Sequence, residues 1–296
     1  MEIVGSATGL GIDERIYAVR FLGEKAYVVT CKFTVRWIES DLSTCSALPL
    51  QLFSPYSIYS YTVASNVNLF CNTVRQIDPF YTLDMSDPTN PVVAGELKIL
   101  GFSNYLHPVS DDLILAIGQN ATDTGTANGL QISLFDVSDF SNPVRVRNYV
   151  EDATWSSSEA QYDHKAFRYL PSSKLLILPL YINSWRDAKD FFDGFVVYDV
   201  DENKDQFSKK FNVSHVEGSD ARNNAKSMYC WSRAELTSRS LVFDGDVMTL
   251  KGHTILRHDL ETEERIGYLN LDEERDRDAE YCSDWYYDSP MIMNWD

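Results

Sequence analysis

Short runs of apolar residues recur along the chain, and four of them end in an aspartate. The aspartates are Asp84, Asp136, Asp199 and Asp259, in the segments YTLDMSDPTNP, ISLFDVSDFSNP, FVVYDVDENKD and ILRHDLETEER. They lie 52, 63 and 60 residues apart, a period typical of an array of similar supersecondary units. Helical periodicity is weak almost everywhere, so the pattern predicts strands rather than helices.

Each unit contains four short extended segments. A leading segment and a second apolar run precede the strand that ends in aspartate, and a further extended segment follows it. The leading segments are 15–22, 104–110, 163–170 and 239–245, the second runs are 25–31, 112–118, 174–182 and 246–252, and the last segments are 91–99, 143–150, 206–216 and 264–271. Four short strands separated by Gly, Asn, Asp and Pro are typical of a β-propeller blade.

The aspartates are expected to shape the turns that follow them. In the first two units the motif D-x-S-D-x-x-N-P contains Asp84 and Asp87, then Asp136 and Asp139. A carboxylate at such a place accepts hydrogen bonds from backbone N–H groups two residues on, and the proline ends one strand before the next begins. We interpret these four residues, with Asp259, as structural turn residues of the blades.

One stretch, residues 33–74, breaks the pattern inside the first unit. It is rich in Ser and apolar residues, and its charged residues are Arg36, Glu39 and Asp41. A connection of that length inside a compact blade is uncommon unless it is functional or disordered. We predict an atypical insertion with three open interpretations: a partner-binding segment, a disordered segment, or noncoding sequence carried into the reading frame.

The composition and charge of the chain limit the kinds of partner that we expect. The 296 residues are 44% hydrophobic and 24% charged, as in a globular protein with a sizeable core. Asp and Glu number 44 against 26 Lys and Arg, for a formal net charge of −18. Nucleic acids and anionic membranes bind through concentrated Lys and Arg, so we expect neither as a partner. The apolar runs are too short for a transmembrane segment, and we expect no signal peptide in this chain.

The segment SSSEAQYDHKAF holds the densest set of reactive side chains. Its serines, Asp163 and His164 have the residue types of a catalytic triad. Neighbours on a strand point to opposite faces, however, and no G-x-S-x-G elbow accompanies them. We assign no catalytic residue and expect His164 to bury its ring between blades. In a second hypothesis, Tyr105, His107, Glu159 and His164 line the central channel and bind a small ligand or a metal.

Two further sequence patterns predict a calcium site and glycosylation sites. The run DVDENKDQFSKK places Asp199, Asp201, Asn203 and Asp205 at alternate positions, as at the start of a calcium loop. Lys204 and Lys210 stand where an EF-hand has Gly and Glu, so the run predicts either a weak surface calcium site or a solvated turn. Asn120 and Asn212 lie in glycosylation sequons, which matter if the chain is secreted.

Several runs outside residues 33–74 resemble a known family. They are IYAVRFLGEKAYVVT, RQIDPFYTLDMSDPTNPVVAGELKI, GFSNYLHPVSDDLILAIGQ, GLQISLFDVSDFSNP, SSSEAQYDHKAF and RSLVFDGDVMTL. In them the chain resembles secreted bacterial and archaeal proteins with a C-terminal β-propeller domain distantly related to WD repeats. The resemblance implies an extracytoplasmic location and no catalytic constellation. It also implies a propeller longer than this chain.

We therefore expect an all-β fold, an incomplete β-propeller of about four four-stranded antiparallel blades in one domain over residues 1–296. The repeat pattern, the absence of a catalytic motif and the resemblance favour a noncatalytic binding or scaffold module. Such a module contacts a protein or glycan through a propeller face or its loops. The alternative is a hydrolase or lyase with a channel site near His107, Glu159 and His164, with or without a metal.

Overall fold

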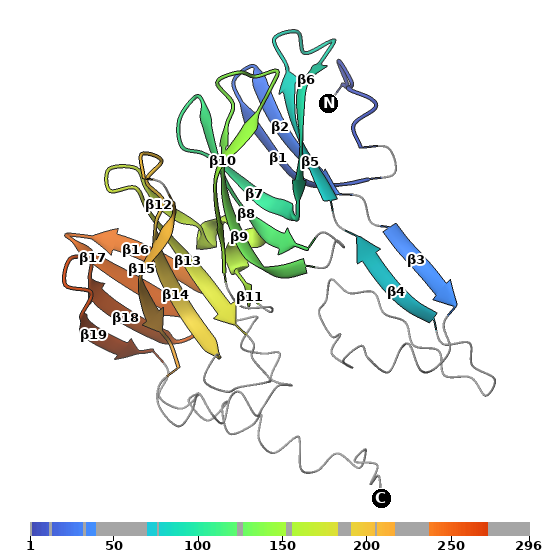
Figure 1. Ribbon diagram of the computed structural model, residues 1–296. Helices are drawn as coiled ribbons and strands as arrows, with labels where there is room; N and C mark the ends of the chain where they lie inside the picture. Colours follow the sequence, from blue (N-terminus) through green and yellow to red (C-terminus); the bar gives the residue numbers. More distant parts are fainter. Residues whose placement is uncertain are drawn as a thin grey trace, which may run out of the picture.

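The computed structural model describes residues 2–11, 14–31, 34–39, 70–75, 77–122, 127–151, 156–182, 191–204, 206–216 and 237–271. Within them, four antiparallel sheets follow one another in chain order, from the upper right to the lower left of Figure 1. Each sheet corresponds to one predicted unit. The expected all-β fold of four-stranded antiparallel blades is confirmed.

The strand bounds are as follows. Blade 1 has β1 (Arg15–Leu22), β2 (Lys25–Cys31), β5 (Ile77–Asp84) and β6 (Val92–Leu100). Blade 2 has β7 (Phe102–Pro108), β8 (Leu113–Ala121), β9 (Ala127–Asp136) and β10 (Val144–Val150). Blade 3 has β11 (Ser156–Ser157), β12 (Arg168–Leu170), β13 (Leu175–Ile182), β14 (Phe192–Asp199) and β15 (Ser208–Ser214). Blade 4 has β16 (Ser238–Phe243), β17 (Asp246–Lys251), β18 (Thr254–Asp259) and β19 (Arg265–Asn270).

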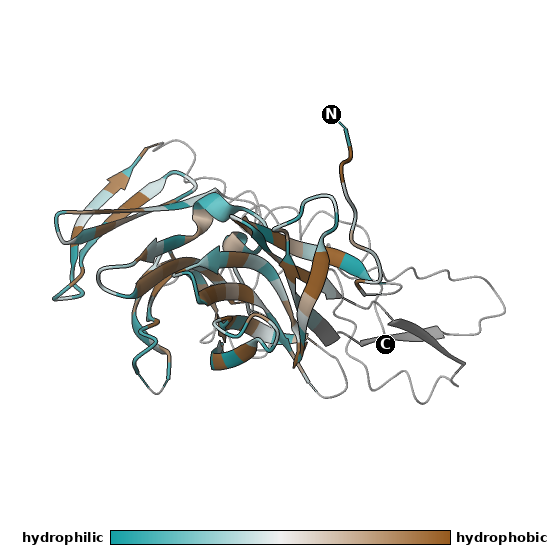
Figure 2. Ribbon diagram, turned by 90° about the horizontal axis from the view of Figure 1, so that it is seen from above, coloured by the Kyte–Doolittle hydropathy of each residue, from teal (hydrophilic) through white to brown (hydrophobic). Residues whose placement is uncertain are grey.

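The central strands of blades 2 and 3 are apolar on both faces because each of these sheets lies between two others. In β8, Ile114 and Ala116 belong to the core shared with blade 1, whereas Leu115 and Ile117 belong to the core shared with blade 3. Successive side chains of a strand point to opposite faces, so a strand buried on both sides reads as a continuous apolar run. Figure 2 shows hydrophobic residues concentrated in these strands and hydrophilic residues in the turns.

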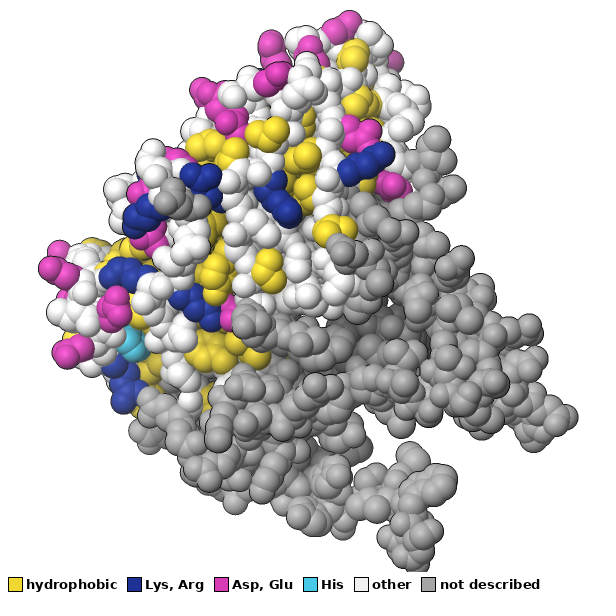
Figure 3. Space-filling model, in the orientation of Figure 1, with side chains coloured by type: hydrophobic (Ala, Val, Ile, Leu, Met, Phe, Trp, Pro, Cys, Tyr) yellow, Lys and Arg dark blue, Asp and Glu magenta, His cyan; other side chains and the backbone are white. Residues whose placement is uncertain are grey.

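The turns after the third strand of each blade are built by aspartates. Their Oδ1 atoms accept the backbone N–H two residues on, from Asp84 to Ser86, Asp87 to Thr89, Asp136 to Ser138, Asp139 to Ser141 and Asp259 to Glu261, at distances of 2.8 to 3.1 Å. Two hydrogen bonds from Ser138, the stronger effect coming from its hydroxyl and the weaker from its backbone N–H, hold the pKa of Asp136 below its usual range. These turns lie at the edge of the molecule where acidic side chains gather in Figure 3.

The inner part of blade 3 differs from the prediction. Residues 163–170 were expected to form a leading strand, but only Arg168–Leu170 forms one. Two 3₁₀ turns precede it, η1 (Glu159–Gln161) and η2 (His164–Ala166). Ser158 caps η1 in a capping box with Gln161, and the Asp163 carboxylate accepts the Lys165 N–H. Side chains that bond nearby backbone groups compete with a strand ladder, which explains the turns.

The insertion begins and ends in strands. β3 (Thr34–Glu39) and β4 (Phe70–Arg75) form a two-stranded antiparallel sheet, with Thr34 opposite Arg75 and Glu39 opposite Phe70. The runs TVRWIE and FCNTVR contain β-branched and aromatic residues, which favour strands. The structure therefore has a strand at each end of residues 33–74. Residues 40–69 lie outside the described residues.

The boundary between blades 3 and 4 is more polar than the other two. From blade 4, only Val247 and Leu256 are fully buried members of the shared apolar core. Beside them Lys251 of β17 forms an ion pair with Asp193 of β14, and their side chains are only 6% and 2% exposed. His215 Nε2 lies 2.9 Å from Thr249 Oγ1 across the same boundary. Specific polar contacts thus stabilise part of this boundary, whereas apolar packing stabilises the other two.

We expect Lys251→Met to lower the free energy of unfolding by about 3–5 kcal/mol, because the buried Asp193 carboxylate loses its partner. The double variant Asp193→Leu/Lys251→Met should recover most of the loss, since no uncompensated charge remains. Urea denaturation followed by far-UV circular dichroism measures both. Lys98→Met, which breaks the exposed pair with Glu96, is the control and should cost less than about 1 kcal/mol. Equal losses for the two single variants would contradict the assignment.

Candidate functional site

Two of the predicted channel residues lie in an aromatic cluster between blades 2 and 3. The His107 ring on β7 lies 4.7 Å from the Phe167 ring and 5.8 Å from the Tyr169 ring, measured between centroids. Tyr105 Oη lies 3.4 Å from His107 Nδ1. Burial lowers the pKa of His107, and the nearby Arg20 charge lowers it further. His107 is therefore a neutral, packed imidazole at neutral pH.

The third predicted residue, Glu159, is engaged in the opposite direction, toward blade 4. One carboxylate oxygen accepts the Ser238 N–H at 2.8 Å, and the other accepts Nη1 of Arg239 at 2.9 Å. The same guanidinium donates from Nη2 to Asp163 at 2.7 Å. The Glu159 side chain is only 14% exposed. Arg239 therefore ties both 3₁₀ turns of blade 3 to the first strand of blade 4.

The fourth residue, His164, is exposed rather than buried between blades. Asp163 is the N-cap of η2 and His164 is its first residue, so the expected alternation of their side chains across a strand is wrong. His107 contacts aromatic rings, Glu159 contacts Arg239, and His164 faces solvent. The structure therefore does not bring these three residues together in one site. Within the part of the chain that the structure describes, no group of three or more His, Cys, Asp or Glu side chains could hold a metal ion.

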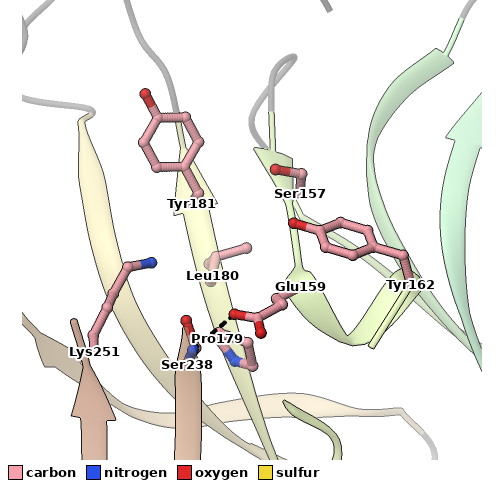
Figure 4. A pocket seen from close by; sticks show the side chains of 8 residues that line it. All are labelled: Ser157, Glu159, Tyr162, Pro179, Leu180, Tyr181, Ser238 and Lys251. Atoms are coloured by element: carbon pink, nitrogen blue, oxygen red, sulfur yellow. Dashed lines mark hydrogen bonds between the residues drawn. The ribbon is translucent and has the colours of Figure 1, made fainter. Parts of the chain in front are cut away.

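A small hollow adjoins Glu159 at the boundary of blades 3 and 4. Its lining residues are Ser157, Glu159, Tyr162, Pro179, Leu180, Tyr181, Ser238 and Lys251, and its volume is about 30 Å³. In Figure 4 the Tyr162 hydroxyl and the Lys251 amine point toward the middle of this group. One water molecule needs about 10–15 Å³ of such volume. The hollow therefore has room for one small polar group and not for a whole substrate.

Sequence reasoning missed the residues that complete this arrangement, Arg239, Lys251 and Tyr162. Arg239 lies 80 positions after its partner Glu159, and Lys251 pairs with Asp193 across two sheets. Arg239 and Lys251 occupy ordinary strand positions in the blade repeat, so no local pattern marks them. Only the packing of blade 4 on blade 3 brings these side chains together.

The predicted calcium run forms a turn with internal partners. Asp199 Oδ1 accepts the Asp201 N–H at 3.2 Å, and Asp201 Oδ1 accepts the Asn203 N–H at 3.0 Å. The other oxygen of Asp199 pairs with the Lys204 amine. Asp205 lies outside the described residues. The Lys204 ammonium group therefore pairs with one of the carboxylate oxygens that a calcium ion would need.

The two sequons differ in access. Asn120 Nδ2, the atom to which a glycan is attached, donates to Asn128 Oδ1 at 2.5 Å. Asn212 is exposed on β15. Asn212 is thus the sequon that the fold leaves accessible. Among the described residues, no helix is long and apolar enough to cross a membrane.

We expect the stability of the protein to fall as the pH drops below about 6.5, because His107 binds a proton more tightly when unfolded than in its aromatic cluster. His107→Phe removes this difference. The free energy of unfolding, measured by urea titration from pH 7.5 to pH 5, should fall less steeply for the variant, by at most about 1.4 kcal/mol per pH unit. Parallel profiles would contradict the packed, neutral imidazole. His258, whose pKa burial also lowers, accounts for a residual slope.

Calcium is expected to leave the melting temperature unchanged, since Lys204 neutralises Asp199 in the turn. A site with a Kd of about 10 µM would add about 2.7 kcal/mol of stability at about 1 mM calcium. Differential scanning calorimetry with calcium and with a chelator distinguishes the two cases. A rise of several degrees would instead establish the calcium site.

Comparisons with known proteins agree with this architecture. The family model described as a beta propeller domain matches residues 1–34 and 56–263, so the break in the match falls inside the insertion. The chain is 34% identical over 209 residues to an uncharacterized protein of Methanocaldococcus jannaschii, covering 71% of this chain and 24% of the relative. It is 32% identical over 192 residues to an uncharacterized protein of Archaeoglobus fulgidus, covering 64% and 23%. The chain spans about a quarter of the length of these relatives.

Two solved structures show a distant likeness. The CNH domain of AfRom2 has a TM-score of 0.31 and 13% identity, over 91% of this chain and 88% of that chain. A mutant of the Synechocystis apocarotenoid oxygenase has a TM-score of 0.32 and 12% identity, over 88% and 50%. The family match covers well over half of the residues and agrees with the four antiparallel blades. The chain therefore belongs to the beta propeller domain family.

Proposed function

We propose that this chain is a noncatalytic binding module that holds a glycan or protein partner at the hollow between blades 3 and 4. The observation that carries the proposal is the set of groups around the hollow. Ser157, Tyr162, Tyr181 and Lys251 line it, and in Figure 4 the Tyr162 hydroxyl and the Lys251 amine point toward its middle. Sites for small polar ligands combine a few placed polar groups with aromatic and apolar walls.

The exposure of Tyr162 supports binding of a larger partner. Tyr162 is 63% exposed, whereas Tyr27 of β2 and Tyr198 of β14 are fully buried. A tyrosine presents a broad apolar surface with a polar tip, and such rings are enriched at interfaces. A sugar ring or a peptide side chain lying on Tyr162 would place one hydroxyl or amide in the hollow.

The charges near the hollow favour binding over catalysis. A general acid or base must be within reach of a substrate proton and be able to exchange that proton. Both oxygens of Glu159 accept hydrogen bonds from blade 4, and the Lys251 amine is paired with buried Asp193. These charged groups hold two blades together, and neither is placed to exchange a proton with a substrate. The extracytoplasmic location that the family resemblance implies is part of the same proposal.

We expect Tyr162→Ala to lose binding to any glycan or peptide that the wild type retains on a printed array. One stacked aromatic ring contributes about 1–3 kcal/mol at an interface hot spot, so the affinity should fall about 10-fold or more. The matched control is Tyr268→Ala on β19, since Tyr268 is 61% exposed and lies outside the hollow. Isothermal titration calorimetry of the retained ligand compares the three proteins.

Two results would contradict the proposal. Equal losses for Tyr162→Ala and Tyr268→Ala would show that the hollow is not the binding site. Turnover of a chromogenic ester or glycoside that disappears in Glu159→Gln or His164→Gln would establish an enzyme instead, because neither substitution removes Tyr162 or the hydroxyls of the hollow.

A further inference from the structure

Tyr162, at the edge of the hollow between blades 3 and 4, projects from a turn that is anchored on both sides. It is the C-cap of η1, and its N–H donates to the Glu159 carbonyl at 3.1 Å. The Glu159 and Asp163 carboxylates both accept hydrogen bonds from blade 4. On the other side, Gln161 Nε2 donates to Asn104 Oδ1 of blade 2 at 3.0 Å. The fold therefore holds this 63% exposed ring in place before any ligand binds.

The hollow beside this ring has charges of both signs in its walls. The Lys251 amine points toward its middle, and the Glu159 carboxylate forms another part of the wall (Figure 4). In a space of about 30 Å³ an entering group lies close to both. A carboxylate or phosphate would meet Glu159, and an ammonium or guanidinium would meet Lys251. Like charges repel strongly where water is excluded, so the hollow favours an uncharged group.

The same two groups favour an occupant that both accepts and donates a hydrogen bond. The Lys251 ammonium carries three N–H donors. The Glu159 carboxylate has acceptor sites beyond those that Ser238 and Arg239 use. A hydroxyl accepts from the ammonium and donates to the carboxylate with a single oxygen, whereas an amide needs an oxygen, a nitrogen and the carbon between them. Because the hollow is small, a hydroxyl is the better match.

The aromatic side chains at the hollow match the rest of a sugar. Tyr162 and Tyr181 both line it, and exposed Ser157 adds a hydroxyl. A sugar ring has an apolar face of C–H groups and hydroxyls around its edge, so it can lie on a tyrosine ring and extend one hydroxyl sideways. The net charge of −18 repels acidic polysaccharides from the molecule as a whole. A neutral sugar meets none of these penalties.

We propose that the ligand of the hollow is a neutral glycan, an inference that rests on the binding site proposed above. One sugar ring stacks on Tyr162. One of its hydroxyls enters the hollow, where it accepts a hydrogen bond from the Lys251 ammonium and donates one to the Glu159 carboxylate. The exposed ring supplies the contact area, and the two charged groups select an uncharged hydroxyl.

Isothermal titration calorimetry with the full chain tests the ligand class. The probes are neutral oligosaccharides of glucose, galactose, mannose and xylose, with oligogalacturonate as the acidic counterpart. At least one neutral probe should bind, and oligogalacturonate should bind at least about 10-fold more weakly. Binding of oligogalacturonate alone, or of none of the neutral probes, overturns the proposal.

Monodeoxy derivatives of the bound sugar locate the hydroxyl. Removal of one particular hydroxyl should weaken binding about 10- to 100-fold, because its hydrogen bonds to two charged groups are lost. An amine in place of that hydroxyl should weaken binding at least as much, since its ammonium form meets Lys251. Equal affinities across the monodeoxy series would overturn the placement of a hydroxyl in the hollow.

Ser157→Leu tests the hollow without touching the ion pairs. Ser157 is exposed and lines the hollow, so a larger side chain there fills the space. The affinity for the neutral probe should fall at least about 10-fold, while the urea midpoint stays at the wild-type value. The matched control is Ser208→Leu, since Ser208 is an exposed strand serine of β15 outside the hollow, and it should bind like the wild type. Unchanged affinity in Ser157→Leu contradicts the proposal.

Failure of this inference is distinguishable from failure of the binding site. Peptides that bind in a Tyr162-dependent way, with none of the neutral glycans bound, overturn the glycan and keep the hollow as the site. Equal losses in Tyr162→Ala and Tyr268→Ala remove the hollow as the site, and with it both proposals.

Discussion

The structure depends on strands that are buried on both faces. Leu176 and Leu178 of β13 pack toward blade 2, while Leu175 and Ile177 of the same strand pack toward blade 4. Fully burying one such side chain contributes roughly 1.5–3 kcal/mol. Blades 2 and 3 on their own would each expose two apolar faces, so they depend on their neighbours for burial. Stability therefore belongs to the boundaries between blades more than to any single sheet.

The boundaries are not equivalent. Blades 1 and 2 share rings such as Phe80 and Phe135, which stack 4.6 Å apart between centroids. Blades 3 and 4 instead share the Lys251–Asp193 pair and the Arg239 contacts with both 3₁₀ turns. Apolar packing tolerates many substitutions of similar volume, whereas buried ion pairs require particular partners. The polar boundary is also where the hollow opens, so the proposed binding surface and the least apolar junction coincide.

The same principle accounts for both ends of the array. At blade 1, Ala7 and Leu10 take the place that a neighbouring sheet would occupy. At blade 4, Leu241 and Phe243 keep more than half of their surface exposed. A fold that buries strands by stacking sheets leaves an apolar face wherever stacking stops, and that face is covered by chain or by a partner.

Much of the fold follows from local pattern. The alternation and length of runs such as LILAIG and LLILPLYI predict strands covered on both sides, and Asp84, Asp136 and Asp259 predict turns because their carboxylates bond N–H groups two residues away. The inner part of blade 3 escaped prediction because Ser158 and Asp163 cap turns in a run that also has strand composition. Capping contacts of this kind compete closely with strand pairing, and local sequence does not rank them.

The sequence alone determined the number of blades, most of their strands and the turn aspartates, since these depend on contacts within a few residues or on a repeated period. Tertiary structure alone decided that Glu159 meets Arg239, that Lys251 meets Asp193, and that His107 and His164 lie in different surroundings. Those pairs join residues up to 80 positions apart that belong to different blades. Their meeting depends on how one blade is placed against the next, which packing over the whole shared face sets and no local pattern encodes.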